Sequence, residues 1–101
     1  MERFGLEKRY IDFIKSTLKN YIMDEDAKFY IFGSRSKGTN KEYSDVDVAI
    51  KLPNSKINEN IMSKILIEFE NSTFPYEVDV VDLNAVNENF RAIISDDLKE
   101  L

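Results

Sequence analysis

The chain has 101 residues, with 14 Lys and Arg against 19 Asp and Glu, so its formal net charge is -5. It contains no Cys, His or Trp. These absences exclude disulfides, thiolate nucleophiles, zinc sites of the finger type and imidazole general bases. Any enzyme chemistry must therefore use carboxylates, hydroxyls, Lys or Arg, backbone amides and a metal ion held by oxygen atoms.

The length fits a single domain, 1–101, and a hydrophobic fraction of 43% is enough for one core. No apolar run approaches the roughly 18 residues of a membrane span, and the first residues lack the apolar stretch of a signal peptide. We therefore expect a cytoplasmic protein with no membrane contact. The acidic balance argues against direct nucleic-acid binding, which relies on Lys and Arg to release counterions.

Hydrophobic periodicity predicts the elements of the first half of the chain. Apolar residues spaced by three and four over 6–22 predict an amphipathic helix. Aromatic and branched residues over 27–32, followed by Gly33, predict a strand that ends in a glycine turn. After a polar stretch over 33–44, strict alternation over 45–52 predicts a half-buried strand, which Pro53 ends.

The second half predicts a helix over 57–70, a strand over 76–83 and a helix over 86–95. The last six residues fit either a frayed helix or a short edge strand. This order predicts an α+β (α/β) fold, with a small mixed β-sheet and helices packed mainly on one face. The other face of such a sheet stays open unless something covers it.

Asp45 and Asp47 lie two residues apart on a predicted strand. Both carboxylates therefore project from one face, with Cβ atoms about 7 Å apart. That spacing suits oxygen ligands that converge on one divalent cation or bridge two. The pattern alone is weak, because the chain holds four acidic pairs of this spacing and a solvated sheet face explains an ordinary one.

The residues just upstream strengthen the metal interpretation. A strand that ends in Gly33 and Ser34 and turns into a short helical segment presents backbone N–H groups to an anion. Arg35, Lys37 and Lys41 make this the most basic stretch of the chain. A phosphate-binding loop directly before an acidic strand is what a metal–nucleotide substrate needs, whereas the alternative is an ordinary glycine loop with solvated lysines.

A third carboxylate comes from the last predicted strand. Asp79 lies between Val78 and Val80, where a charge is costly unless it has a partner or a ligand. If this strand pairs beside 45–52, Asp79 completes a cluster of three carboxylates. Asp82 is the rival candidate, but a turn or helix cap explains it better.

At this point the residues match a known pattern. Gly33-Ser34, ten intervening residues and Asp45-Val46-Asp47 resemble the signature of the nucleotidyltransferase superfamily that includes polymerase β. The runs 32–39 and 44–50 are similar to its minimal nucleotidyltransferase (MNT) branch, and 75–83 is similar to the strand that carries the third carboxylate of that branch. The resemblance spans roughly 27–95. Ser36 stands where alanine is usual, and Lys37 where arginine is common.

The resemblance implies the polymerase β-like fold and the transfer of a nucleoside monophosphate from a nucleoside triphosphate to a hydroxyl, with release of pyrophosphate. Positioning and charge neutralisation dominate such a transfer, so it needs no histidine. Two Mg²⁺ ions and ATP are the expected cofactor and substrate, and Asp79 would be either the third metal ligand or the base for the acceptor hydroxyl. The implied site residues are the metal ligands Asp45, Asp47 and Asp79 and the nucleotide-binding residues Gly33, Ser34 and Arg35.

The resemblance also implies a protein partner. MNT proteins of this size commonly pair with a small helical HEPN-family protein, and in the better understood pairs the MNT protein is an antitoxin that transfers AMP to a tyrosine of a HEPN toxin. Two alternatives stay open. In the first, the chain is a non-catalytic antitoxin subunit that acts by contact alone. In the second, it is a nucleotidyltransferase whose acceptor is an RNA end or a small molecule such as an aminoglycoside.

Overall fold

A computed structural model describes residues 2–101. The four strands form one mixed sheet in the order β3-β2-β1-β4, in which β1 is antiparallel to β2 and β4, and β2 is parallel to β3. None of the described helices is long and apolar enough to span a bilayer. In chain order the elements are α1 (Lys8–Tyr21), β1 (Lys28–Phe32), α2 (Ser34–Lys37), β2 (Val46–Lys51), α3 (Glu59–Asn71), β3 (Val78–Asp82), α4 (Glu88–Ile94), the 3-10 helix η1 (Ser95–Asp97) and β4 (Lys99–Glu100).

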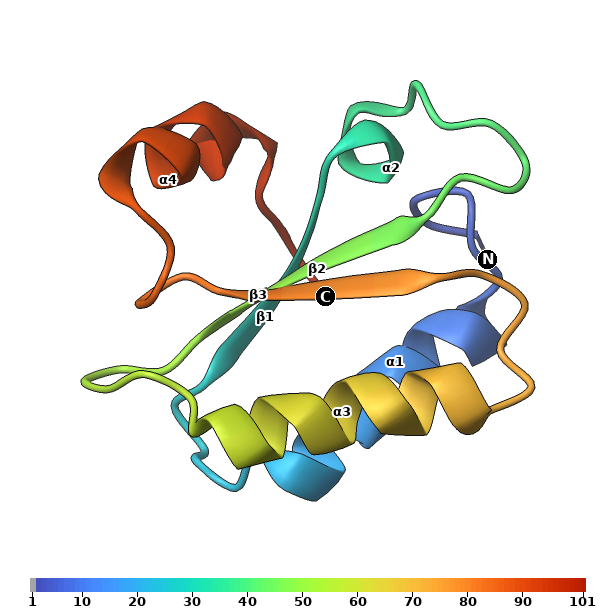
Figure 1. Ribbon diagram of the computed structural model, residues 1–101. Coiled ribbons are helices and arrows are strands. Elements are labelled where there is room, and N and C mark those ends of the chain that lie inside the picture. The colour runs from blue at the N-terminus through green and yellow to red at the C-terminus, as the bar shows by residue number, and fades with distance from the viewer. Residues whose placement is uncertain (1) are drawn as a thin grey trace.

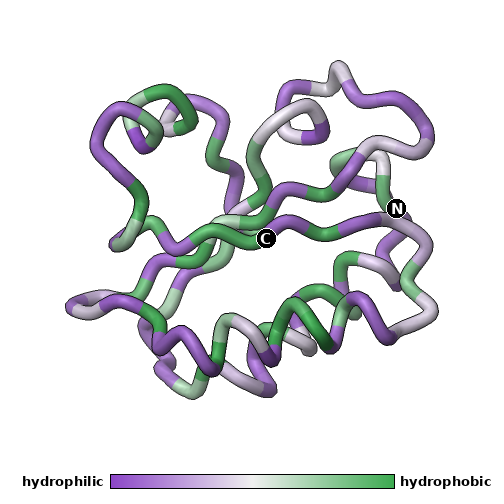
Figure 2. The backbone as a smooth tube through the Cα atoms, in the orientation of Figure 1, coloured by the Kyte–Doolittle hydropathy of each residue, from purple (hydrophilic) through white to green (hydrophobic). Residues whose placement is uncertain are grey.

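The larger helices, α1 and α3, cover one face of the sheet, while α2 and α4 lie on the opposite side (Figure 1). The main core forms where α1 and α3 meet the strands, and Figure 2 shows hydrophobic residues along the strands and on the helices that face them. The predicted alternation correctly identifies the buried face of β2, because Val46, Val48 and Ile50 are all fully buried in this core. The predicted fold class is therefore confirmed.

The second face of the sheet is covered only in part. Phe32, Ala49 and Leu83 form a smaller buried cluster with Ile94 of α4. Toward the start of β2 the same face remains accessible, since Asp45 and Asp79 are exposed and Asp47 is half-buried. The expectation of an open second face therefore holds only at the end of the sheet where the acidic residues lie.

Asp82 has the structural role that the sequence favoured. Its buried carboxylate accepts hydrogen bonds from the backbone N–H of Ile57 (2.6 Å) and of Asn84 (2.9 Å). These bonds tie the end of β3 to the segment that leads into α3. The crossover helix between the parallel strands is thereby held at its entry, and Asp82 is not available to the acidic site.

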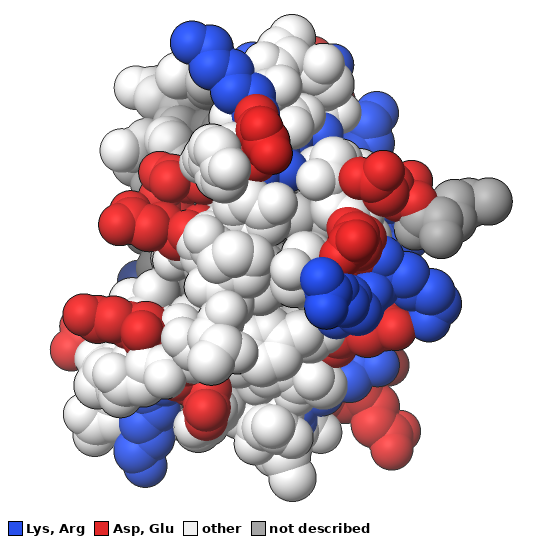
Figure 3. All heavy atoms as spheres, turned by 90° about the vertical axis from the view of Figure 1, so that its right-hand side faces the viewer, with Lys and Arg blue, Asp and Glu red and all other residues white. Residues whose placement is uncertain are grey.

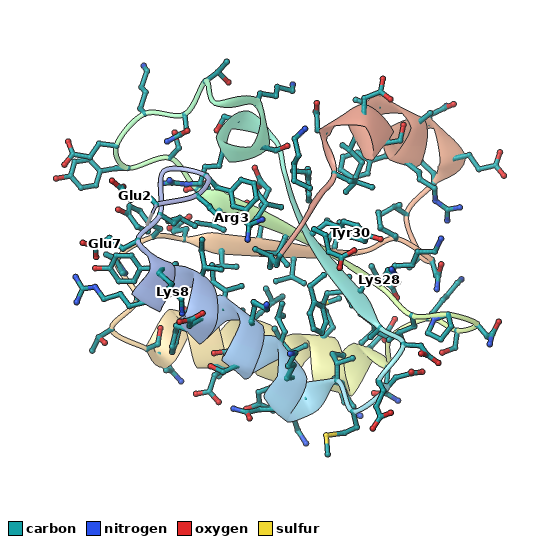
Figure 4. The ribbon with its side chains drawn as sticks, turned by 180° about the vertical axis from the view of Figure 1, so that it is seen from behind. Glu2, Arg3, Glu7, Lys8, Lys28 and Tyr30 are labelled. Atoms are coloured by element: carbon teal, nitrogen blue, oxygen red, sulfur yellow. The ribbon has the colours of Figure 1, made fainter. Side chains whose placement is uncertain are left out.

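The last residues form the short edge strand that the sequence left open, rather than a frayed helix. β4 pairs with β1, and the Leu101 N–H donates to the Phe29 carbonyl (2.9 Å). Arg3 donates to the Glu100 carbonyl (3.0 Å), and Lys28 forms an ion pair with the Glu100 carboxylate (3.7 Å). Figure 4 labels Arg3 and Lys28 in the view from behind.

Helix α2 is linked to the C-terminal segment by the two residues that depart from the MNT pattern. The Ser36 hydroxyl donates to the Asp97 carbonyl. The Lys37 ammonium lies 3.4 Å from the Asp97 carboxylate. Both contacts reach η1, so the loop after β1 is attached to a segment about sixty residues later in the chain.

Arg35 lies inside the protein rather than on the surface of the loop. Its side chain is only 2% exposed, although it comes from a polar, basic stretch. Its guanidinium lies 4.6 Å from the centre of the Tyr76 ring. The same guanidinium donates to backbone carbonyls of two loops, those of Phe4 (3.0 Å), Gly5 (3.1 Å), Glu42 (3.4 Å) and Ser44 (2.8 Å). These donors are used within the protein, so the structure does not direct them at a phosphate, and the nucleotide contact of Arg35 stays a prediction.

We expect Arg35→Met to lower the free energy of unfolding by about 3 kcal/mol, because it leaves several carbonyls without their charged donor. Arg35→Lys should lose less stability, since the charge remains while the planar fork is lost. Urea unfolding followed by circular dichroism measures both. Arg9→Met is the matched control, because Arg9 is exposed and pairs with exposed Glu7. An Arg35→Met protein as stable as this control would contradict the assigned role.

Candidate active site

The pairing of the strands brings the predicted carboxylates together. In the parallel register of β2 and β3, Asp47 lies directly opposite Asp79. Asp45 immediately precedes β2, whose first N–H, that of Val46, donates to the Glu77 carbonyl (2.8 Å). Residues that pair across strands project from the same face of the sheet. The three acidic side chains therefore belong to one end of one face.

Gly33 completes this arrangement from the neighbouring strand. Phe32 pairs with Asp47 across β1 and β2, so the next residue, Gly33, lies against the Asp47 side chain. A Cβ atom on Gly33 would come within 2.5 Å of the Asp47 Oδ2, and the φ angle of Gly33 is 75°. Glycine is required here both for its backbone conformation and for the space that the carboxylate occupies. The sequence suggested only the approach of a phosphate.

The electrostatics of the site favour a cation. Burial is the main cause that raises the pKa of Asp47 above its ordinary value, and the neighbouring charges of Asp79 and Asp45 add to this effect. None of the ion pairs formed by the described residues involves these three side chains. A half-buried carboxylate beside two others is destabilised until a positive ion joins it.

The donor set therefore fits a hard divalent cation, which prefers carboxylate oxygens. Among residues 2–101, however, no three acidic side chains converge closely enough to form a ready-made metal cluster. Repulsion between like charges opposes such convergence when no cation is bound. The backbone thus places the three residues at one end of the sheet, while their side chains are not drawn together.

Helix α2 begins immediately after Gly33, and Ser34 is its first residue. No side chain caps its first turn, and the early N–H groups of a helix have no partner within it. Gly38 ends the helix in the left-handed conformation, with φ 76°. The loop can therefore present amide groups and the Ser34 hydroxyl beside the acidic residues.

Tyr76 is a residue that the sequence did not single out. It lies three residues before Asp79 and beneath the guanidinium of Arg35, and it contacts Tyr10 of α1 edge to face, with ring centres 6.0 Å apart. It therefore helps fix the loop that leads into β3. No local pattern marks this role, because its partners come from positions 10 and 35.

The structure thus brings some of the predicted site residues near one another. It places the acidic residues and the glycine turn side by side, with the first residue of α2 next to them, and it turns the arginine away into a separate network. The predicted residues that come together are Gly33, Ser34, Asp45, Asp47 and Asp79. Their roles in binding nucleotide and metal stay predictions.

Comparison with known proteins supports the same family. The nucleotidyltransferase domain model matches residues 8–101. A protein of Haemophilus influenzae named "Probable protein adenylyltransferase MntA" is 30% identical over 92 residues, which cover 91% of this chain and 78% of that protein.

Two solved structures share the fold. The crystal structure of a toxin–antitoxin with AMP-PNP gives a TM-score of 0.68 at 22% identity, covering 94% of this chain and 72% of that one. A protein of Sulfolobus solfataricus described as a nucleotidyltransferase gives 0.56 at 18% identity, covering 91% and 76%. The domain match spans the whole sheet and every residue of the candidate site. The chain therefore belongs to the nucleotidyltransferase domain family and is a relative of the MntA-type adenylyltransferases.

Proposed function

We propose that the chain is a Mg²⁺-dependent protein adenylyltransferase that transfers AMP from ATP to a hydroxyl of a partner protein. The observation that carries this proposal is the placement of Asp47 opposite Asp79, with Gly33 packed against the Asp47 carboxylate. The name of the Haemophilus influenzae relative supports protein adenylylation. The toxin–antitoxin neighbour, solved with AMP-PNP, supports both a nucleotide substrate and an antitoxin role.

The partner in this proposal is a HEPN-family toxin, and the acceptor is the hydroxyl of one of its tyrosines. These two assignments rest on the MNT-like runs at 32–39, 44–50 and 75–83. The cytoplasmic location expected from the sequence and the single domain 1–101 belong to the same proposal.

Asp45, Asp47 and Asp79 would hold the metal, with two Mg²⁺ ions expected. When bound, Mg²⁺ would neutralise charge on the triphosphate and on the phosphoryl group in transfer. Gly33 and Ser34 would bind the triphosphate through backbone N–H groups and a hydroxyl. The half-buried position of Asp47 lowers the dielectric around its charge, which strengthens its attraction to a cation.

In the transfer, the acceptor oxygen would form a bond to the α-phosphorus of ATP while the bond from that phosphorus to the pyrophosphate oxygen breaks. The proton of the acceptor hydroxyl would pass to the Asp79 carboxylate if this exposed residue is the base. If Asp79 is instead the third metal ligand, the proton would leave to solvent. Pyrophosphate would leave from the side of Gly33 and Ser34.

A second candidate function is a non-catalytic antitoxin subunit that neutralises its partner by contact. The specific observation in its favour is that the acidic side chains of the described residues do not form a ready-made metal cluster. A transferase acting on a small molecule or an RNA end has no such support from the structure.

Incorporation of labelled AMP from ATP into a HEPN-family partner separates the two functions. We expect Mg²⁺-dependent labelling by the wild type and a rate at least about 100-fold lower for Asp45→Asn combined with Asp47→Asn, since the metal ligands are lost. Tryptic mass spectrometry locates the acceptor. A double variant that labels as well as the wild type would refute catalysis at this site, and one that neutralises the toxin fully would favour the contact function.

Substitution of the two turn glycines tests the contact with Asp47. Gly33→Ala should reduce AMP transfer about 100-fold, because the new Cβ displaces the Asp47 carboxylate. Gly38→Ala is the matched control, since Gly38 also has a positive φ but a Cβ there meets no atom within 4 Å. Both variants lose stability, so rates are compared per folded protein. Equal rates for the two variants would show that Asp47 does not need the space beside Gly33.

The raised pKa of Asp47 predicts a pH-dependent cost to stability in the metal-free protein. The folded state holds the proton of Asp47 more tightly than the unfolded state, so stability falls as the pH rises from the ordinary Asp pKa through the raised value. In EDTA we expect Asp47→Asn to be more stable than the wild type at pH 7, with a difference that shrinks toward acid pH. Urea unfolding at several pH values measures it, and a difference independent of pH would contradict the assignment.

A further inference from the structure

A groove runs along the free edge of β3 and opens beside Asp79. Its volume is about 440 Å³, and it lies between the last turns of α3, the loop over 74–77 and the start of β3. β3 is an edge strand, so no other strand covers this side. The apolar part of the groove includes Leu66, Phe69, Phe74 and Tyr76.

The charged groups of the groove are all acidic. Glu70, Glu77 and Asp79 belong to its lining, and no Lys or Arg does. Glu70 and Glu77 are exposed and take no part in the ion pairs formed among the described residues. Figure 3 faces this side of the molecule and shows an uncharged band with Asp and Glu side chains along both of its borders, mixed with Lys and Arg on one of them.

The order of the strands shows on which side of the candidate site the groove lies. Gly33 follows β1, Asp47 lies on the central β2, and Asp79 lies on β3 at the edge. In phosphoryl-type transfer the attacking and leaving oxygens lie roughly in line on opposite sides of the phosphorus. If pyrophosphate leaves on the β1 side, the acceptor hydroxyl must arrive from the β3 side, where the groove opens.

We propose that this groove binds the acceptor segment of the partner protein, and that it selects a hydroxyl-bearing aromatic side chain flanked by Lys or Arg. This inference rests on the proposed transfer of AMP to a protein hydroxyl. The aromatic and aliphatic lining takes the ring of the acceptor, whose hydroxyl then reaches Asp79. Glu70 and Glu77 attract the flanking cations and are the specificity-determining residues.

The surface beside the groove is also mostly acidic. A second hollow of about 440 Å³ shares Tyr76 with the groove, and Glu2, Glu7 and Glu42 contribute to it. Its one cationic side chain, Arg9, forms an ion pair with Glu7 (2.7 Å). Figure 4 labels Glu2 and Glu7 near the N-terminal end of α1. A basic acceptor segment longer than the groove therefore meets further negative charge on this side.

Two fluorescein-labelled peptides test the selection, one with a central tyrosine flanked by lysines and the other with the same tyrosine flanked by glutamates. Fluorescence anisotropy in Mg²⁺ at about 0.1 M salt, where the Debye length is about 10 Å, measures their binding without any transfer. We expect the wild type to bind the lysine peptide more tightly. Glu70→Lys combined with Glu77→Gln should weaken that binding about tenfold, from the loss of exposed charge pairs. Glutamine at position 77 avoids placing a cation next to Asp79.

The matched control is Glu59→Lys combined with Glu25→Gln, which makes the same change in net charge. Glu59 lies in the first turn of α3, about 16 Å along the helix from Glu70. Figure 1 shows this end of α3 and the loop after α1 at the opposite end of the molecule from the groove. The control should bind the lysine peptide nearly as well as the wild type, because its charges lie beyond a Debye length.

Transfer of labelled AMP to the same peptides and the KM for ATP are measured separately. If transfer fails while the lysine peptide is preferred and the groove variant loses the preference, the proposed function fails and the acidic groove stands. Equal binding of both peptides by the wild type would overturn the inference even if AMP is transferred. A groove variant that raises the KM for ATP and keeps the peptide preference would also overturn it, because the groove would then bind the nucleotide.

Discussion

The arrangement of the site depends on the hydrogen bonds that the buried guanidinium of Arg35 donates to backbone carbonyls. A charged group at 2% exposure is tolerated only when its donors are satisfied, and here the acceptors are carbonyls from separate loops. One acceptor is Ser44, which directly precedes Asp45. The Tyr76 ring under the guanidinium lies three residues before Asp79. The Arg35 side chain therefore contacts both segments that lead into the site, the one before Asp45 and the one before Asp79.

The parallel pairing of β2 and β3 creates a local conflict that the rest of the fold must balance. It brings Asp47 and Asp79 opposite one another, and the charge of Asp79 adds to the burial that raises the pKa of Asp47. Buried Val46 and Val48 on the other face of β2, packed between α1 and α3, stabilise the same pairing. The site is thus a region of electrostatic cost held in place by an apolar core, as is common where ionisable groups serve binding or catalysis.

Much of the fold could be predicted because the local alternation of apolar and polar residues indicates which side chains are buried. Val46, Val48 and Ile50 identify β2 within a residue, and its phase places Asp45 and Asp47 on the opposite face. The position of Asp79 was predictable only on the condition that its strand pairs with β2. The sequence could not decide between a frayed helix and the edge strand β4, because two residues carry no periodicity.

Other features depend on contacts between distant positions. Arg35 looked like a surface cation because its polar neighbours give no sign that carbonyls about thirty residues earlier would enclose it. The acidic groove likewise combines the end of α3 with the start of β3, which no single stretch of sequence displays. The packing of α4 on the second face depends on the small cluster around Ala49, and periodicity cannot indicate which face a helix chooses.

The contacts of α2 have a consequence for local opening. Arg35 attaches this single turn to the segment around Gly5, while Ser36 and Lys37 attach it to Asp97. A four-residue helix has little stability of its own, so its order derives from these attachments. Fraying of either terminal segment would loosen the loop that follows β1. Amide hydrogens of α2 should therefore exchange together with those of the terminal segments, as one cooperative unit.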